Sequence, residues 1–359
     1  MSADIILASQ DNAALAAPRR ALKAASFKNI SAIYIAAGLS GFYALWVPGT
    51  FLTIPVWKSL LAGGAITALA TTGLVLPLAA GVFDLALGSE VGFGAIVFAW
   101  LLSARHVPVA LAFLLTLAVG AAIGVVSGLL ITRARIDSFI TTLGMSSILL
   151  ALIAWVSNGE QILNLGATVQ SVATGQFLGV VYPVWIMLLV GLLAWYVLQC
   201  TPVGRRIYAT GGNATAARLA GVRTNIVIVG SLTACGAIAA LSGSLVSAQL
   251  ATGDPTIGPA YLLPAFAAAF LGSTQFRGGR YNIWGAVLAV YVLDIGVKGL
   301  QLGGAPTWIP DLFNGAALIL AVGMARFQRS TGRAGAIRRS LRLRGEQPAP
   351  EAEPVNQAS

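Results

Sequence analysis

Two groups of charged residues lie within otherwise apolar stretches of this sequence, where they could line a solute path or carry protons. The first is Asp84 with Glu90 in GVFDLALGSE (81–90), and the second is Asp294 with Lys298 in VLDIGVKGL (292–300). An acid at the centre of a membrane helix costs about 2.5–3.5 kcal/mol on insertion scales. Such a residue is expected to face a bundle interior, a cavity or a partner, so both groups are candidate functional sites.

The residues around Asp84 predict a break in the helix that carries it. A proline and two glycines interrupt one long apolar tract: Pro77, Gly81 and Gly88. We therefore expect a discontinuous helix around residues 77–90. A second interpretation is that Asp84 and Ser89 cap the two half-helices, and capping is compatible with lining a path.

Asp294 and Lys298 have the i to i+4 spacing of an intrahelical ion pair, with the acid in the better, N-terminal position. A neutralised pair, with Lys298 extending to the outer interface, is the interpretation we favour over a binding role.

The elements that would position these residues are membrane-spanning helices. Hydrophobic residues make up 57% of the 359 residues and charged residues 9%, whereas soluble domains carry about 25% charged residues. This predicts an all-α integral membrane protein. The ten expected spans are 31–48, 53–74, 82–103, 108–131, 138–157, 181–200, 225–250, 260–275, 282–302 and 308–325.

The distribution of basic residues predicts the orientation. With both termini in the cytoplasm, all of the 22 Lys and Arg residues except Lys58, Arg105 and Lys298 fall on the cytoplasmic side. Residues 1–30 then form a cytoplasmic segment and 31–325 the transmembrane domain. Residues 326–359 form a tail that is first basic, able to lie on anionic lipid, and then disordered. The formal charge of +10 thus requires no nucleic acid partner.

The cytoplasmic loop at 201–224 predicts a short exposed helix. Asn213 can cap a helix that runs to Leu219 or Ala220, and Gly221 can end it. Its side chains are small apart from Arg218 and Leu219, so a groove in another protein could approach its backbone closely.

Sequence signatures of enzymes are missing. No Gly-Lys pair is present, which excludes a phosphate-binding P-loop, and HExxH, GxSxG and Cys/His clusters are also missing. The single histidine cannot form a metal site by itself. We predict a transport subunit without catalytic residues, metal or cofactor of its own.

Four stretches of the chain resemble the membrane-spanning permease subunits of ribose-type sugar ABC importers. They are 81–102, 128–149, TPVGRRIYATGGNATAARLAGV (201–222) and FLGSTQFRGGRYNIWGAVL (270–288). The resemblance implies a subunit of a bacterial inner-membrane importer that works with a cytosolic ATPase, which binds ATP and Mg²⁺, and with an extracytoplasmic solute-binding protein. A second permease, identical or paralogous, would complete the path.

The resemblance also assigns residues. The residues that match the family's ATPase-coupling loop are Gly211, Gly212, Asn213, Ala216, Ala217, Arg218, Leu219 and Gly221. The family's motif before its third span falls on 80–89, which implies a translocation path beside Phe83, Asp84, Ser89 and Glu90.

Departures from the family pattern concern the solute. Leu262 and Pro264 stand where many relatives carry acids, and Phe83, Ala86 and Lys298 also differ from the usual residues. We therefore expect a monosaccharide or similar small polar solute, without assigning ribose. Branched-chain amino acids or nucleosides remain alternatives, followed by an ion-coupled secondary transporter using Asp84 and Glu90, and last by a membrane enzyme.

Overall fold

Long apolar helices make up most of the protein. The computed structural model describes residues 27–163, 165–275 and 279–323. The longer helices are α2 (Phe27–Trp46), α4 (Ile54–Ala79), α5 (Leu87–Ser103), α6 (Val109–Thr132), α7 (Ser138–Ser157), α9 (Tyr182–Cys200), α12 (Thr224–Leu250), α13 (Leu262–Gln275) and α14 (Ile283–Leu302). The last described helix is Ile309–Gly323.

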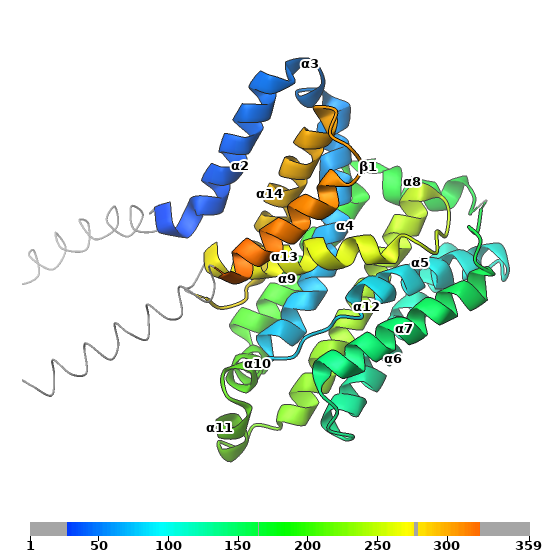
Figure 1. The fold of residues 1–359 in the computed structure, drawn as a ribbon. Helices are drawn as coiled ribbons and strands as arrows, with labels where there is room; N and C mark the ends of the chain where they lie inside the picture. The colour runs from blue at the N-terminus through cyan, green and yellow to red at the C-terminus, as the bar shows by residue number, and fades with distance from the viewer. Residues whose placement is uncertain (1–26, 164, 276–278, 324–359) are drawn as a thin grey trace, which may run out of the picture.

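Short elements connect the long helices. They are α3 (Pro48–Phe51), α8 (Ala167–Thr174), β1 (Gln176–Phe177), β2 (Val180–Val181), α10 (Pro202–Gly212), α11 (Ala214–Leu219) and the 3-10 helix η1 (Gly258–Tyr261). The strands β1 and β2 form a small antiparallel hairpin. Figure 1 shows α3, β1 and α8 towards one end of the molecule and α10 and α11 at the opposite end.

The all-α membrane class is confirmed. Six helices are long and apolar enough to cross a bilayer: α4, α6, α7, α9, α12 and α14. Three further apolar helices are shorter: Leu87–Ser103, Gly258–Ser273 and Ile309–Gly323. Each of the ten expected spans overlaps a helix, α2 included, whereas the number of crossings and the side of each terminus stay predictions. The predicted tail at 326–359 and nearly all of the segment 1–30 lie outside the described residues.

Helix α12 lies at the centre of the packing. It contacts α4, α5 and α6, while α14 packs on α2, α4 and α13. The contact with α6 is close because glycines face it: a Cβ on Gly120 would lie 2.5 Å from Ala240 Cβ. Without water to drive association, such small-residue contacts let membrane helices gain dispersion energy from backbone approach.

Candidate functional site

The predicted break in the helix at 77–90 is present and lies between α4 and α5. Residues 80–86 are not helical, so α5 begins at Leu87, five residues later than the start of the expected span at 82. Helix α4 ends in a Schellman motif, in which Val82 N donates to Pro77 O and Gly81 N donates to Leu78 O. Gly81 has the left-handed φ of +83° that this ending requires.

Asp84 and Ser89 have partners that differ from ordinary helix caps. Asp84 Oδ1 accepts a hydrogen bond from Ala86 N at 3.1 Å, which fixes the turn directly before α5. Ser89 Oγ lies 2.7 Å from Ser146 Oγ on α7. Asp84 therefore shapes the turn that begins α5, while Ser89 ties α5 to α7, a contact that the sequence did not indicate.

Asp84 and Glu90 meet in a buried cluster, to which α12 adds Cys235. One ligand atom from each of the three residues lies within 4.8 Å of the others, and each carboxylate residue is 1% exposed. Among the described residues, Asp84 Oδ2 and both carboxylate oxygens of Glu90 have no hydrogen-bond partner. Buried carboxylates in this arrangement need a shared proton or a cation for compensation, because an isolated buried charge is very unfavourable.

The exposed helix expected in the loop at 201–224 is α11, and its caps are those that the sequence predicts. Asn213 Oδ1 accepts hydrogen bonds from Thr215 N and Ala216 N, both at 3.0 Å. At the other end Gly221 N donates to Arg218 O, with a φ of +84° at Gly221. Leu219 is 87% exposed, so the helix presents an apolar side chain beside the exposed Arg218 to the solvent.

The structure brings this loop into contact with the break between α4 and α5. Gly211, at the end of α10, packs so closely on α4 that an added Cβ would overlap Ala79 O. A Cβ on Gly81 would lie 3.0 Å from Gly211 Cα. By contrast, a Cβ on Gly212 would have no atom within 4 Å. Two regions separated by more than a hundred residues are thus in direct contact.

The profile of a family of transport proteins matches residues 57–322, and the family is described as "Branched-chain amino acid transport system / permease component". The chain belongs to this family of permeases. It is therefore a multi-pass membrane protein and a transport component.

Several relatives of the permease have names that mention sugars. The ribose import permease RbsC of Escherichia coli K12 is 35% identical over 277 residues, which are 76% of this chain and 86% of that protein. The L-arabinose ABC transporter permease AraH of Azospirillum brasilense is 30% identical over 81% of this chain and 85% of its own length. The D-allose permease AlsC of Escherichia coli K12 is 26% identical over 82% and 90%. No solved structure matches the chain.

An apolar groove of about 470 Å³ lies beside the break in the permease. The rings of Phe83 and Phe139 pack against each other in it at a tilt, with centroids 4.7 Å apart. The rest of its lining is Leu85, Leu262, Leu263, Phe266, Phe270, Tyr281, Leu318 and Val322. Phe83 thus reaches a groove, whereas the other three residues expected beside a path, Asp84, Ser89 and Glu90, are buried next to it.

Asp294 and Lys298 lie close together on α14, but they form no ion pair within 4.0 Å among the described residues. Both side chains instead line a polar cavity with residues of α4 and α12. The ion pair that we favoured from the spacing is therefore not formed, and the residue types alone did not indicate the cavity because its other walls come from distant helices.

Proposed function

We propose that the chain is the permease subunit of an ATP-driven, binding-protein-dependent importer of a monosaccharide or similar small polar solute in the bacterial inner membrane. Membership of the permease family and the sugars in the names of its relatives support this solute class. A separate cytosolic ATPase would bind ATP and Mg²⁺, and an extracytoplasmic binding protein would deliver the solute.

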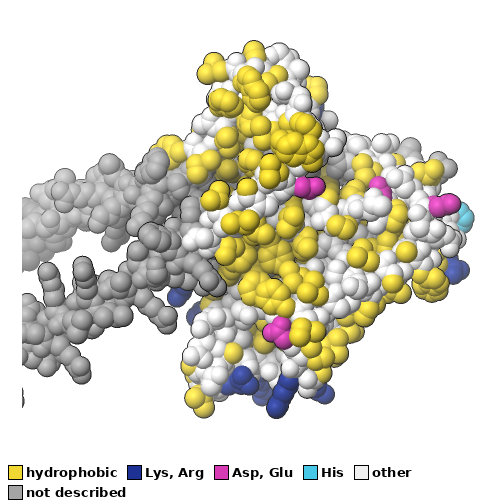
Figure 2. All heavy atoms as spheres, viewed as in Figure 1, with side chains coloured by type: hydrophobic (Ala, Val, Ile, Leu, Met, Phe, Trp, Pro, Cys, Tyr) yellow, Lys and Arg dark blue, Asp and Glu magenta, His cyan; other side chains and the backbone are white. Residues whose placement is uncertain are grey.

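The proposed orientation has ten crossings with both termini in the cytoplasm. Six arginines at one end of the bundle are exposed: Arg133, Arg135, Arg205, Arg206, Arg218 and Arg223. Figure 2 shows dark blue side chains gathered at this end, where α10 and α11 lie. Basic loops stay on the cytoplasmic side of bacterial membranes, which supports a cytoplasmic α11. In this proposal α3, α8 and the hairpin would then lie outside.

The observation that carries the coupling proposal is the contact of Gly211 with Ala79 and Gly81. In this proposal α11 docks in a groove of the ATPase, with Arg218 and Leu219 reaching furthest. Nucleotide-driven movement of α11 and α10 would then press directly on the end of α4 and on the segment 80–86. Because that segment leads into α5, the movement would reach the proposed path beside Phe83, whose shape Asp84, Ser89 and Glu90 help to fix.

A second permease, identical or paralogous, would face the apolar groove in this proposal. The groove and its surroundings expose large apolar side chains, including Ile140, Leu143 and Leu263, and Figure 2 shows broad apolar areas on the visible face. In a membrane such side chains are suited to lipid or to another helix, and two copies meeting here would enclose a path between them.

The experiment that tests this function combines purification with transport. The tagged chain is purified from native membranes in mild detergent, its partners are identified by mass spectrometry, and sugar uptake is measured in vesicles supplied with ATP. We expect an ATPase subunit in near-equal amount, and we expect Arg218→Glu to lose both the ATPase and ATP-driven uptake while the chain still inserts. Unchanged uptake by Arg218→Glu would reject the docking role of α11. Uptake that continues without ATP but collapses with the proton gradient would reject the importer.

A further inference from the structure

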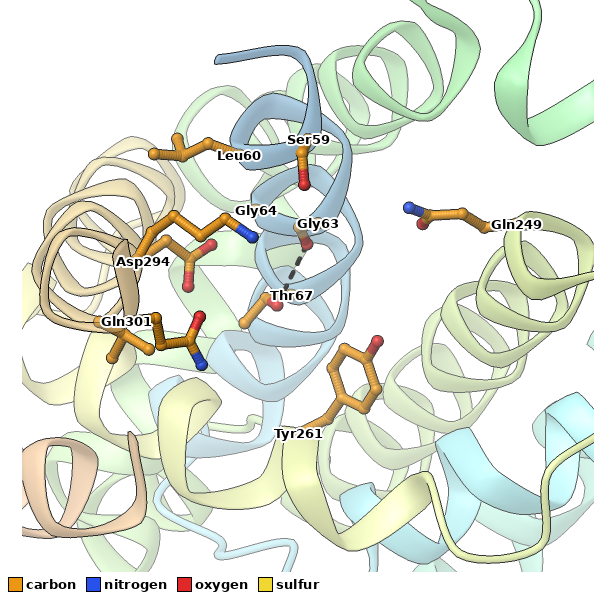
Figure 3. A pocket seen from close by; sticks show the side chains of 11 residues that line it. Ser59, Leu60, Gly63, Gly64, Thr67, Gln249, Tyr261, Asp294 and Gln301 are labelled. Atoms are coloured by element: carbon orange, nitrogen blue, oxygen red, sulfur yellow. Dashed lines mark hydrogen bonds between the residues drawn. The ribbon is translucent and has the colours of Figure 1, made fainter. Parts of the chain in front are cut away.

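A polar cavity of about 440 Å³ lies inside the single chain, and it shares no lining residue with the groove that contains Phe83. Its walls come from α4, α14, the end of α12 and η1, as Figure 3 shows. The lining residues are Ser59, Leu60, Gly63, Gly64, Thr67, Gln249, Tyr261, Asp294, Val297, Lys298 and Gln301. The volume is within the range of about 300–1,000 Å³ that is typical of ligand pockets.

The cavity extends inward from the end of the bundle that carries α3. Its rim includes the exposed residues Ser59 and Gln301, while Thr67 at its floor is 9% exposed. Ser59 and Thr67 are eight residues apart on α4, and at 1.5 Å per residue the wall between them is about 12 Å deep. In the proposed orientation the rim opens to the extracytoplasmic side, where a binding protein would release its solute.

The lining carries both charged and neutral hydrogen-bonding groups. It offers one carboxylate, one ammonium group, two primary amides, a phenol and two hydroxyls, whereas its aliphatic side chains are only Leu60 and Val297. Figure 3 shows Gln249, Tyr261 and Asp294 extending from three different sides of the space. The many neutral hydrogen-bonding groups of this wall fit the hydroxyls of an uncharged polyhydroxyl molecule.

The carboxylate of Asp294 lines the cavity together with Lys298 but has no direct partner among the described residues. It forms no hydrogen bond and no ion pair within 4.0 Å with the residues that the structure describes. Room for it comes from Gly64, since a Cβ there would lie 2.8 Å from Asp294 Oδ2 and 2.7 Å from Tyr291 Cε1. The hydroxyl of Thr67 donates to Gly63 O at 3.2 Å, which leaves its oxygen free to accept from a ligand.

We propose that this cavity binds a monosaccharide-sized, uncharged polyhydroxyl solute within one permease subunit, on the extracytoplasmic side of the path. Asp294, Gln249 and Gln301 would hydrogen-bond the solute's hydroxyls, and Tyr261 would contact its apolar face. This proposal rests on the proposed function, because it names an entry site for the transported solute.

Protection of an introduced cysteine tests the site. Thr67→Cys is made in the full chain with Cys200→Ser, since Cys200 is exposed and Cys235 is buried. The variant replaces the native copy in its host, and right-side-out vesicles are treated with a charged methanethiosulfonate. The probes are D-ribose, L-arabinose, D-allose and L-leucine, each at high millimolar concentration. Gly49→Cys, whose site in α3 is open and exposed at the same end of the bundle but outside the cavity lining, is the control for nonspecific effects on labelling.

We expect at least one of the sugars to slow labelling of Thr67→Cys several-fold, with no effect of L-leucine, and we expect Asp294→Asn to weaken that protection while labelling continues. Protection by L-leucine alone would overturn the solute class. The site would be overturned if no sugar slows the labelling of Thr67→Cys, or if this cysteine is not labelled at all. This conclusion would hold even for vesicles that show ATP-driven sugar uptake. If a sugar protects Thr67→Cys in vesicles that show no ATP-driven uptake, the binding site would be supported and the proposed importer function would be rejected.

Discussion

The cluster of Asp84 and Glu90 and the cavity of Asp294 contain the same chemical group in opposite settings. In the cluster, both carboxylate residues are 1% exposed and sealed between α5 and α12. In the cavity, Asp294 stands in a space of about 440 Å³ with exposed residues at its rim. An acid inside the membrane therefore does not by itself mark a solute site. What distinguishes the two is whether neighbouring helices leave room for a ligand.

Replacing Asp294 by leucine should produce the most severe defect in uptake. A hydrogen bond to a charged group contributes about 1.5–3 kcal/mol, so we expect Asp294→Leu to reduce the initial rate of sugar uptake about 10- to 150-fold. Leucine inserts into a membrane helix more favourably than aspartate, so the amount of inserted protein should not fall. Uptake by vesicles, normalised to the permease detected by immunoblot, measures the effect. A rate within twofold of the wild type would show that Asp294 does not contact the solute.

The adjacent glycines Gly211 and Gly212 test the contact between α10 and the end of α4, which leads into the segment that carries Asp84. Gly211→Ala must displace the end of α4, because its Cβ would overlap Ala79 O, whereas Gly212→Ala meets nothing within 4 Å. Overpacking of this kind costs about 1–3 kcal/mol, so we expect a lower thermal midpoint and several-fold weaker ATP-driven uptake for Gly211→Ala only. Equal behaviour of the two variants in a thermal unfolding assay would contradict the tight contact.

The paired glycines of α4 test the cavity in the same way, with a smaller expected effect. Gly64→Ala places a methyl group against Asp294 and Tyr291, while Gly63→Ala, also in the wall, meets no atom within 4 Å. We expect Gly64→Ala to raise the apparent KM for sugar uptake several-fold and Gly63→Ala to change it less than twofold. An equal apparent KM for the two variants would mean that the carboxylate of Asp294 has no part in binding.

The sequence predicts the local features of the permease well, because they depend on nearby residues. The helix spans, the break marked by Pro77 and Gly81, and the caps of α11 at Asn213 and Gly221 all follow from apolar length and turn chemistry. The family resemblance is confirmed by the profile and the relatives.

Contacts between distant helices could not be predicted in the same way. No local pattern places Cys235 of α12 beside Glu90, or Gly64 of α4 beside Asp294. The i to i+4 spacing favoured an ion pair between Asp294 and Lys298 because it describes only one helix, whereas the space provided by Gly64 and the groups on α12 and η1 belongs to the assembled bundle.

Leucine at Glu90 should have the smallest effect, although it also replaces an acid within the membrane domain. In the part of the chain that the structure describes, neither carboxylate oxygen of Glu90 has a hydrogen-bond partner, so leucine removes a buried carboxyl group without leaving a partner unsatisfied. Replacing buried polar groups by apolar groups of similar size is often neutral or stabilising. We expect Glu90→Leu to keep uptake within twofold and to leave the thermal midpoint unchanged or higher. A tenfold loss of uptake at normal stability would instead mean that Glu90 faces the solute during transport, and the sealed cluster would then open in another state of the permease.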